Sequence, residues 1–132
     1  MSNRIIAAAG IAAPLGPYSM AVACDGPGTW LHIAGQVGVD ADGKLADDFE
    51  GQARLAWSNL AAVLQAASMQ MRHVVKVTTF LTRPADVPLL GPVRAAFLGE
   101  ARPASTLVIV QALASPQWRV EVEATAFLPA AA

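Results

Sequence analysis

Residues 73–82 read His73-Val-Val-Lys-Val-Thr-Thr-Phe-Leu-Thr82, and this stretch decides how the rest of the chain is arranged. It is rich in β-branched residues, which favour strands. Side chains alternate between the two faces of a strand, and here both faces carry apolar groups. Val75, Val77 and Leu81 fall on one face, and Val74 and Phe80 fall on the other. The pattern predicts a strand that is covered on both sides.

The residues before this strand predict an amphipathic helix from Phe49 to Met71. Apolar side chains stand at positions 49, 53, 56, 57, 60, 63, 64, 67 and 71, the 3.6-residue period of a helix with one apolar face. Asp47 or Asp48 is the candidate N-cap. Glu50 stands three residues after Asp47, as in a capping box. The helix is therefore expected to begin at Phe49 and to pack one face on a sheet.

A second helix is predicted after the strand, from about Val87 to Leu98. Asp86 is placed to cap it, Pro88 is tolerated in its first turn, and Gly99 ends it. Two helices with one apolar stripe each can cover only one face of a sheet. The other face of the strand at 73–82 must then contact another subunit, so the sequence predicts a homo-oligomer.

Four further strands are predicted, arranged as two hairpins. The first hairpin joins Tyr18–Cys24 to Thr29–Val37 through Asp25-Gly-Pro-Gly28, which is strong turn chemistry. The second joins Ser105–Leu113 to Trp118–Leu128 through a short connection. The predicted order is β-β-α-β-α-β-β, which is an α+β fold.

The composition fits one domain over residues 1–132, with 55% apolar and only 14% charged residues. So low a charged fraction in a small domain also indicates that other subunits cover part of its surface. No run of about 18 uncharged apolar residues is present, as a membrane span requires. The apolar stretch near the N-terminus is too short for a signal peptide. We expect a cytoplasmic protein with no membrane partner.

Charge and metal-binding residue types exclude two further classes. The net charge is −1 and no Lys/Arg cluster occurs, so no nucleic-acid partner is expected. The single cysteine, Cys24, cannot form an internal disulfide. His32 and His73 are far apart in the sequence and lack cysteine partners, so no metal site is predicted.

Six segments together resemble the RidA family (YjgF/YER057c/UK114). They are Gly16-Pro-Tyr-Ser19, Ile33-Ala-Gly-Gln-Val37, Asn59-Leu60-x-x-Val63-Leu64, Val74–Thr82, Arg102-Pro-Ala-Ser-Thr106 and Val120-Glu-Val-Glu-Ala124. The similarity extends over most of the chain, roughly Gly16 to Phe127. It implies a chorismate-mutase-like mixed sheet with two helices packed on one face. It also implies a homotrimer with small-molecule clefts at the subunit interfaces.

The resemblance also implies an activity. Active members of the family hydrolyse enamine and imine intermediates released by PLP-dependent dehydratases, which gives 2-keto acids and ammonia. They use no metal and no organic cofactor. An arginine holds the substrate carboxylate through two parallel hydrogen bonds, for which its planar fork is suited. A glutamate and backbone groups position the attacking water.

The family's site residues are carried over by position. Glu121 matches the acidic residue that positions water. The substrate-binding positions are Tyr18, Gly35, Gly91, Ser105, Thr106 and Leu107. Among these, Ser105 stands where the family has its arginine, Gly91 where it often has asparagine, and Leu107 where it often has cysteine. Three polar or reactive positions have therefore become small or apolar.

The serine at position 105 changes what the cleft is expected to bind. A hydrogen bond to a charged group contributes roughly 1.5–3 kcal/mol, whereas a bond from a neutral hydroxyl contributes about 0.5–1.5 kcal/mol. Ser105 cannot replace a bidentate guanidinium. Arg94, Arg102 and Arg119 are the arginines that could supply a cation from elsewhere, but replacement is not expected. The sequence predicts weak or absent activity towards small imino acids and a less acidic ligand.

Each of these positions also has a purely structural interpretation. Glu121 and Glu123 point to the same side of the last predicted strand and could form a solvated face. Tyr18 could be a core or interface aromatic, and Ser105 and Thr106 could be ordinary strand residues.

Two functions stay open at this point. The first is a trimeric imine or enamine deaminase with altered or lost activity, and the second is a non-catalytic trimer that binds a small ligand or regulates another process. Some relatives are described as endoribonucleases, but a net charge of −1 without a basic stripe argues against RNA cleavage.

Overall fold

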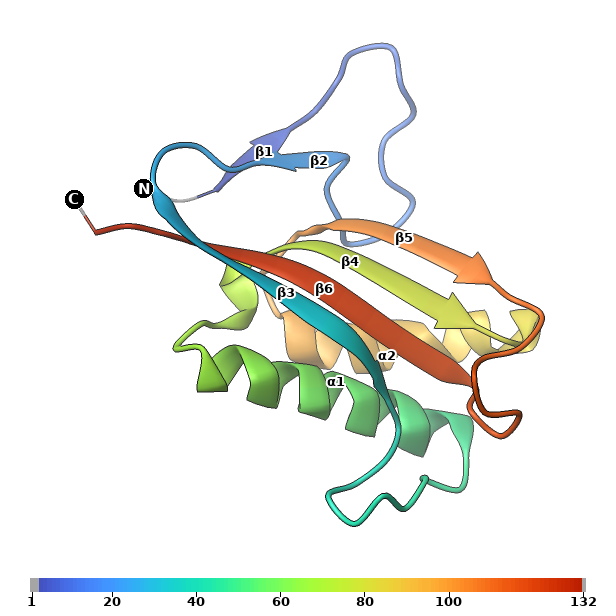
Figure 1. The fold of residues 1–132 in the computed structure, drawn as a ribbon. Helices are drawn as coiled ribbons and strands as arrows, with labels where there is room; N and C mark the ends of the chain where they lie inside the picture. The colour runs from blue at the N-terminus through green and yellow to red at the C-terminus, as the bar shows by residue number, and fades with distance from the viewer. Residues whose placement is uncertain (1–2, 132) are drawn as a thin grey trace.

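A computed structural model describes residues 3–131 and shows a curved sheet, two helices and a short ribbon near the N-terminus (Figure 1). The strands are β1 Arg4–Ile6, β2 Ala21–Ala23, β3 Gly28–Val37, β4 Val74–Leu81, β5 Ala104–Ile109 and β6 Val120–Pro129. The helices are α1 Phe49–Ala66 and α2 Val87–Leu98. A short 3-10 turn, Met71–His73, leads into β4.

The main sheet has four strands in the order β3-β6-β4-β5. The last strand, β6, lies between β3 and β4 and is antiparallel to both. β4 and β5 are parallel, with Val77 opposite Ser105. Parallel neighbours need a long crossover, and α2 supplies it. The sheet is therefore mixed, as the family resemblance implies.

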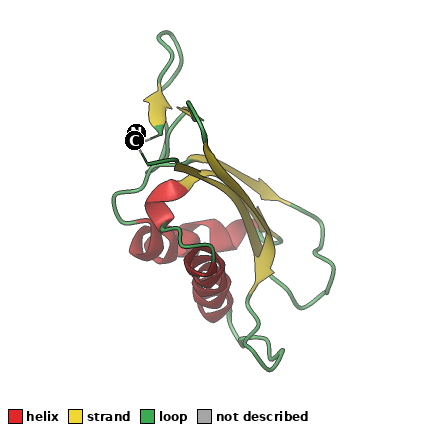
Figure 2. Cartoon of the chain, turned by 60° about the vertical axis from the view of Figure 1, so that its left-hand side comes forward, coloured by secondary structure: helices red, strands yellow, loops and turns green. Residues whose placement is uncertain are grey.

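Both helices lie on the same face of this sheet, and within residues 3–131 no helix lies on the opposite face (Figures 1 and 2). The core forms between the helices and the sheet, because each helix presents its apolar stripe to it. Its buried residues include Trp57, Leu60 and Leu64 of α1, Leu90 and Val93 of α2, and Val77, Leu81, Val120 and Val122 of the strands. The predicted α+β fold, with two helices on one face of a mixed sheet, is confirmed.

One detail of the central strand differs from the prediction. The pairing of β4 with β6 shifts between Val74 and Lys76, which is a β-bulge. An extra residue in one strand reverses the alternation of its side chains. Val74 therefore belongs to the core beside the helices, together with Val77, although the sequence pattern assigned these two valines to opposite faces.

The start and end of α1 refine the sequence prediction. Asp48, not Asp47, is the N-cap, and its Oδ1 accepts a hydrogen bond from the Gly51 backbone N–H at 2.8 Å. The third helical residue is thus Gly51, so the predicted capping box is wrong, and Glu50 instead pairs with the guanidinium of Arg54. The helix ends at Ala66 rather than at Met71. Ser68 has a φ of 59°, which does not continue an α-helix.

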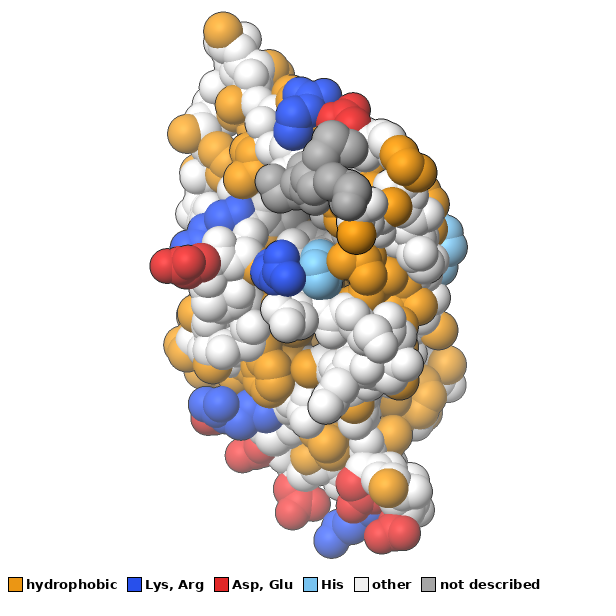
Figure 3. All heavy atoms as spheres, turned by 90° about the vertical axis from the view of Figure 1, so that its left-hand side faces the viewer, with side chains coloured by type: hydrophobic (Ala, Val, Ile, Leu, Met, Phe, Trp, Pro, Cys, Tyr) orange, Lys and Arg blue, Asp and Glu red, His pale blue; other side chains and the backbone are white. Residues whose placement is uncertain are grey.

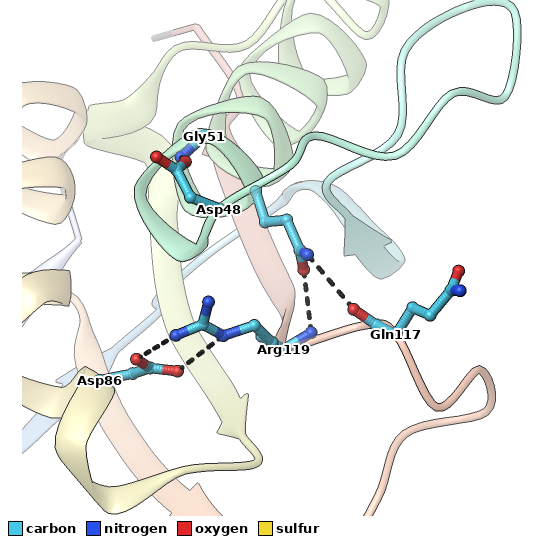
Figure 4. Close-up of polar contacts among 6 residues, drawn as sticks. Asp48, Gly51, Asp86, Gln117 and Arg119 are labelled. Atoms are coloured by element: carbon cyan, nitrogen blue, oxygen red, sulfur yellow. Dashed lines mark hydrogen bonds and ion pairs between the residues drawn. The ribbon is translucent and has the colours of Figure 1, made fainter.

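The bounds of α2 are those predicted, and Gly99 ends it with a φ of 55°. Asp86 occupies the N-cap position, but its carboxylate makes no capping hydrogen bond. The carboxylate instead forms an ion pair with Arg119 at the start of β6 (Figure 4). The predicted capping role of Asp86 is therefore wrong, because a charged partner from another element takes up its oxygens.

Neither predicted hairpin is formed. β2 pairs with β1, a strand that the sequence did not predict, and β3 pairs with β6. β5 pairs with β4, so Ser105–Leu113 and Trp118–Leu128 are not neighbours in the sheet. The chain does turn at residues 25–28, but turn chemistry acts locally and does not select the partner of a strand.

Candidate functional site

Glu121 and Gly35 lie against each other where β3 and β6 pair. The register between these strands shifts between Ile33 and Gln36, so Gly35 sits in a bulge. A Cβ built on Gly35 would overlap Oε2 of Glu121. Only a glycine leaves room for the carboxylate at this point. The structure thus brings together two of the residues that the sequence singled out.

The carboxylate of Glu121 belongs to the face of the sheet that the helices leave uncovered. Its strand neighbours Val120 and Val122 are fully buried in the core, so Glu121 points the other way. The residue that pairs with it on β4 is Phe80, which also faces away from the helices. Glu121 is half-buried and forms no hydrogen bond or ion pair within residues 3–131.

The segment that carries Tyr18 runs alongside the beginning of β5, where Ser105 lies. Ser19 pairs with Ala104, and its backbone N–H donates to the Pro103 carbonyl at 3.0 Å. Tyr18 and Ser105 flank this pair on either side. The loop between β1 and β2, residues 7–20, is called the N-terminal loop. Within it the Tyr18 hydroxyl accepts a hydrogen bond from the Leu15 backbone N–H at 3.4 Å, which holds the ring against the loop.

The three candidate residues of β5 do not share one face. Ser105 is paired with Val77, which is in the core, so it points towards the helices. Leu107 follows the same phase and packs against the core. Thr106 points to the uncovered face, where its hydroxyl accepts a hydrogen bond from Nζ of Lys76 at 2.6 Å. Ser105 and Leu107 therefore belong together, and Thr106 lies apart from them.

Gly91 lies on α2 and leaves open space. A Cβ built there would meet no atom within 4 Å. The structure thus leaves room for a side chain or a ligand group at this position of α2.

Arg94 is one of the three arginines that could replace the missing cation, although the sequence did not lead us to expect that replacement. It lies on α2, three residues after Gly91, and residues at this spacing lie next to each other on a helix surface. A Cβ built on Gly16 would lie 3.8 Å from Nη2 of Arg94 and 3.7 Å from two atoms of the Tyr18 ring. Burial lowers the pKa of the half-buried Arg94 guanidinium, and the nearby Tyr18 opposes this effect. The helical spacing from Gly91 is the signal that could have identified it.

The other two arginines considered from the sequence are engaged elsewhere. Arg119 makes two hydrogen bonds to the carboxylate of Asp86, at 2.6 and 3.2 Å, and its backbone N–H donates to Gln52 (Figure 4). Arg102 is exposed and donates to the carbonyls of Gly99 and Ala101. Both of these guanidinium groups already have partners, whereas Arg94 has none within residues 3–131 and lies close to Gly16 beside the Tyr18 ring.

The candidate residues thus form two separate groups. The acidic group, Glu121 with Gly35, lies at β3 and β6 on the uncovered face. Apart from Thr106, the remaining residues are called the cleft group. Tyr18, Ser105 and Leu107 lie at or beside β5, the other edge of the sheet, and Gly91 and Arg94 lie on α2, with Arg94 close to Gly16 beside the Tyr18 ring. Strand β4 separates the two groups, and they point to opposite faces. One copy of the chain does not bring them together.

The larger hollows of a single chain do not join these groups either. An apolar hollow of about 600 Å³ lies under the N-terminal loop and is lined by Tyr18, Ile11, Leu15 and Met20 among others. A polar hollow of about 800 Å³ lies beside Arg119 and Gln52. Neither is lined by Glu121 or Ser105.

Comparison with known proteins identifies the family. The sequence model described as Endoribonuclease L-PSP matches residues 9–128. The chain belongs to this family, which is the RidA family. The resemblance seen in the sequence is therefore confirmed.

Curated and solved RidA-family members resemble the chain over nearly its whole length. A RutC family protein of Pyrococcus horikoshii is 35% identical and covers 86% of this chain and 89% of its own. A 2-iminobutanoate/2-iminopropanoate deaminase of Capra hircus is 35% identical and covers 94% and 89%. The crystal structure of the Rid-family protein YyfB of Yersinia pestis, described as of unknown function, is 34% identical. It has a TM-score of 0.86 and covers 97% of this chain and all of its own.

The surface of this RidA-family chain shows no concentration of positive charge on the face drawn in Figure 3. Lys and Arg side chains stand apart there, with acidic side chains close to several of them. No helix within residues 3–131 is both long enough and apolar enough to cross a bilayer. In the same part of the chain, no three His, Cys, Asp or Glu side chains gather as metal ligands would.

Proposed function

We propose that the protein is a homotrimeric imine hydrolase of the RidA type, with one cleft at each subunit interface. In each cleft the Glu121 carboxylate of one copy positions water against a ligand that lies beside Tyr18 of the next copy. The observation that carries this proposal is the placement of Glu121 over Gly35. Relatives about as similar as the other matches are named 2-iminobutanoate/2-iminopropanoate deaminases, which supports the choice of reaction.

The uncovered sheet face supports the assembly. Trp30 is 51% exposed and Val108 is 37% exposed, and both lie on this face with Phe80. Exposed apolar groups on a sheet face favour burial against another copy. Strand β5 is an edge of the main sheet, so a copy whose uncovered face packs across this edge would bring its acidic group towards the cleft group of its neighbour.

The proposed reaction consumes one water and needs no cofactor. The water oxygen bonds to the imine carbon while Glu121 accepts a proton from the water and passes it to the imine nitrogen. Glu121 then moves the second water proton from the new hydroxyl to nitrogen. The C–N bond breaks with its electron pair on nitrogen, which releases ammonia and a carbonyl compound. A positioned acid–base group of this kind contributes about 10²–10⁴-fold to the rate.

Ser105 supports a second candidate, a trimer that binds a small molecule without turning it over. Without an arginine at this position, small imino acids lose the clamp that the family uses. The same observation, under the first candidate, supports an altered preference among imines. Ammonia release separates the two candidates.

The test uses imines generated in situ by an L-amino-acid oxidase with catalase present, and ammonia release is measured with and without the protein. Imines formed from simple amines by an amine oxidase extend the assay to uncharged substrates. We expect the wild-type protein to accelerate release, and Glu121→Gln to lower kcat/KM about 100-fold. Glu123→Gln is the matched control, because Glu123 is an exposed carboxylate on the same strand face.

Three results would count against the proposal. If no imine is hydrolysed faster, the protein is not a deaminase, and the binding function stands. If Glu121→Gln is as active as the wild type, the carboxylate does not position water. A particle that is monomeric by light scattering contradicts the interface clefts altogether.

A further inference from the structure

Arg94 stands out among the basic side chains of the chain. Other arginines donate hydrogen bonds to a carboxylate or a backbone carbonyl, as Arg119 does to Asp86 and Arg102 to Gly99. Arg94 makes no hydrogen bond and no ion pair within residues 3–131. It is nevertheless half-buried, and that burial lowers the pKa of its guanidinium. A partly desolvated cation without a partner has free donors to offer a ligand.

The surroundings of Arg94 place those donors in the cleft group. Its Nη2 lies beside Gly16 and Tyr18, so the side chain reaches from α2 to the N-terminal loop. Tyr18 adjoins the β5 entry through the pairing of Ser19 with Ala104, one residue before Ser105. On the helix surface next to Arg94, the missing side chain of Gly91 leaves open space.

We propose that Arg94 binds the anionic group of the ligand, in place of the arginine that is absent at position 105. The inference rests on the proposed function, because it assumes that the ligand lies beside Tyr18. The positive group of the cleft has then moved from strand β5 to helix α2. The planar guanidinium can hold a carboxylate through two parallel hydrogen bonds, and the space left by Gly91 and Ser105 admits the ligand. The ligand is an acid, contrary to the less acidic ligand expected from the sequence alone.

The test compares binding of 2-oxobutanoate with binding of its uncharged methyl ester, by titration calorimetry or ligand-observed NMR. We expect the wild-type protein to prefer the acid. Arg94→Gln weakens binding of the acid about 10- to 100-fold, the equivalent of losing a charge-assisted pair, and leaves binding of the ester unchanged. Arg94→Lys keeps the charge but loses the fork, and its affinity for the acid falls between the two. Arg102→Gln is the matched control, because that exposed arginine bonds only to nearby carbonyls.

A second variant tests the replacement itself. Ser105→Arg introduced into the Arg94→Gln protein restores the preference for the acid if both positions serve the same ligand group. Melting curves of every variant show whether it is folded. If Arg94→Gln is not folded, Arg94→Lys is used in its place.

The proposal is overturned if the wild-type protein binds the acid no better than the ester, or if Arg94→Gln binds both as the wild type does. These outcomes are independent of turnover. A protein that needs Arg94 for acid binding but releases no ammonia contradicts the deaminase proposal alone. A protein that releases ammonia and shows no effect of Arg94→Gln on acid binding or on kcat/KM contradicts the role of Arg94 alone.

Discussion

Arg119 and Arg94 carry the same side chain in opposite surroundings. Arg119 joins β6 to the start of α2 through two hydrogen bonds to Asp86, whose side chain is only 3% exposed, and its guanidinium also lies 5.5 Å from the Phe49 ring centre. Arg94 lies between α2 and the N-terminal loop, beside Tyr18, and bonds to nothing within residues 3–131.

The contrast shows how a cation can be assigned a role from its partners. A guanidinium with a buried carboxylate partner stabilises the fold, because removing either partner leaves the other uncompensated. A half-buried guanidinium without a partner contributes little to folding and is available for an anion. Proteins commonly accept such an unfavourable group where function requires it.

The largest effect on stability is expected from breaking the ion pair between Arg119 and Asp86. Asp86→Ala leaves the Arg119 guanidinium without its carboxylate, and we expect the free energy of unfolding to fall by about 3 kcal/mol. Urea denaturation at one fixed protein concentration measures this, so that any association between copies is the same for every variant.

The matched control is Glu50→Ala, which removes the exposed i,i+4 pair with Arg54 and costs about 0.5 kcal/mol or less. If Asp86→Ala lowered the free energy of unfolding no more than this control, the ion pair of Arg119 with Asp86 would not stabilise the fold.

The next effect tests whether Arg94 of one copy and Glu121 of a neighbouring copy belong to the same cleft. Subunits carrying Glu121→Gln and subunits carrying Arg94→Gln are co-expressed with different tags, and trimers that carry both tags are purified. If each cleft takes Glu121 from one copy and Arg94 from the next, such a trimer holds one intact cleft in three. Its activity towards an acidic imine should then be about a third of the wild-type activity, although each parent is nearly inactive.

Doubly tagged trimers of a single variant are the control and should stay inactive. Mixed trimers that are no more active than the parents would mean that the two groups of residues do not meet between copies.

Apart from β1, the helices and strands of the fold could be predicted from the sequence because they follow from local rules. The bounds of α2 follow from its apolar spacing, with Gly99 at its end, and the layer arrangement follows from two helices with one apolar stripe each. The pairing of strands could not be predicted in the same way. β6 enters the sheet between β3 and β4, and nothing within β6 itself names those partners.

The candidate site divides along the same line. Gly35 and Glu121 were identified by matching motifs, but their contact depends on a β-bulge that no local pattern indicates. Asp86 looked like a helix cap because the sequence does not show that Arg119 approaches it from β6. Replacement of the missing cation by Arg94 was not expected, because the sequence does not show that Gly16 and Tyr18 lie beside this side chain. In each case the missing information is a contact between segments that are distant in the sequence.

A smaller effect is expected from two glycines, one in each group of candidate residues. In Gly35→Ala the new methyl group overlaps the Glu121 carboxylate, so we expect the carboxylate to be displaced and kcat/KM to fall about 10-fold or more. Gly91→Ala meets no atom within 4 Å and lies inside α2, where alanine is favoured by about 0.5–1 kcal/mol.

The two glycine variants are compared by urea denaturation and by ammonia release. Gly91→Ala should raise the free energy of unfolding, and Gly35→Ala should lower activity by more than any change in stability explains. Full activity of Gly35→Ala would show that the position of the Glu121 carboxylate does not matter to the reaction.

The smallest effect is the one expected of Arg94→Gln on folding. Because Arg94 has no bonding partner within residues 3–131 to lose, we expect the free energy of unfolding to change by less than about 0.5 kcal/mol. Burial disfavours the charged form of Arg94 in the folded chain, so any change should be towards greater stability. Arg119→Gln is the comparison, since it strands the buried Asp86 carboxylate. A loss of stability at Arg94 as large as that at Arg119 would mean that both arginines stabilise the fold. The lack of a bonding partner would then not indicate that Arg94 binds a ligand.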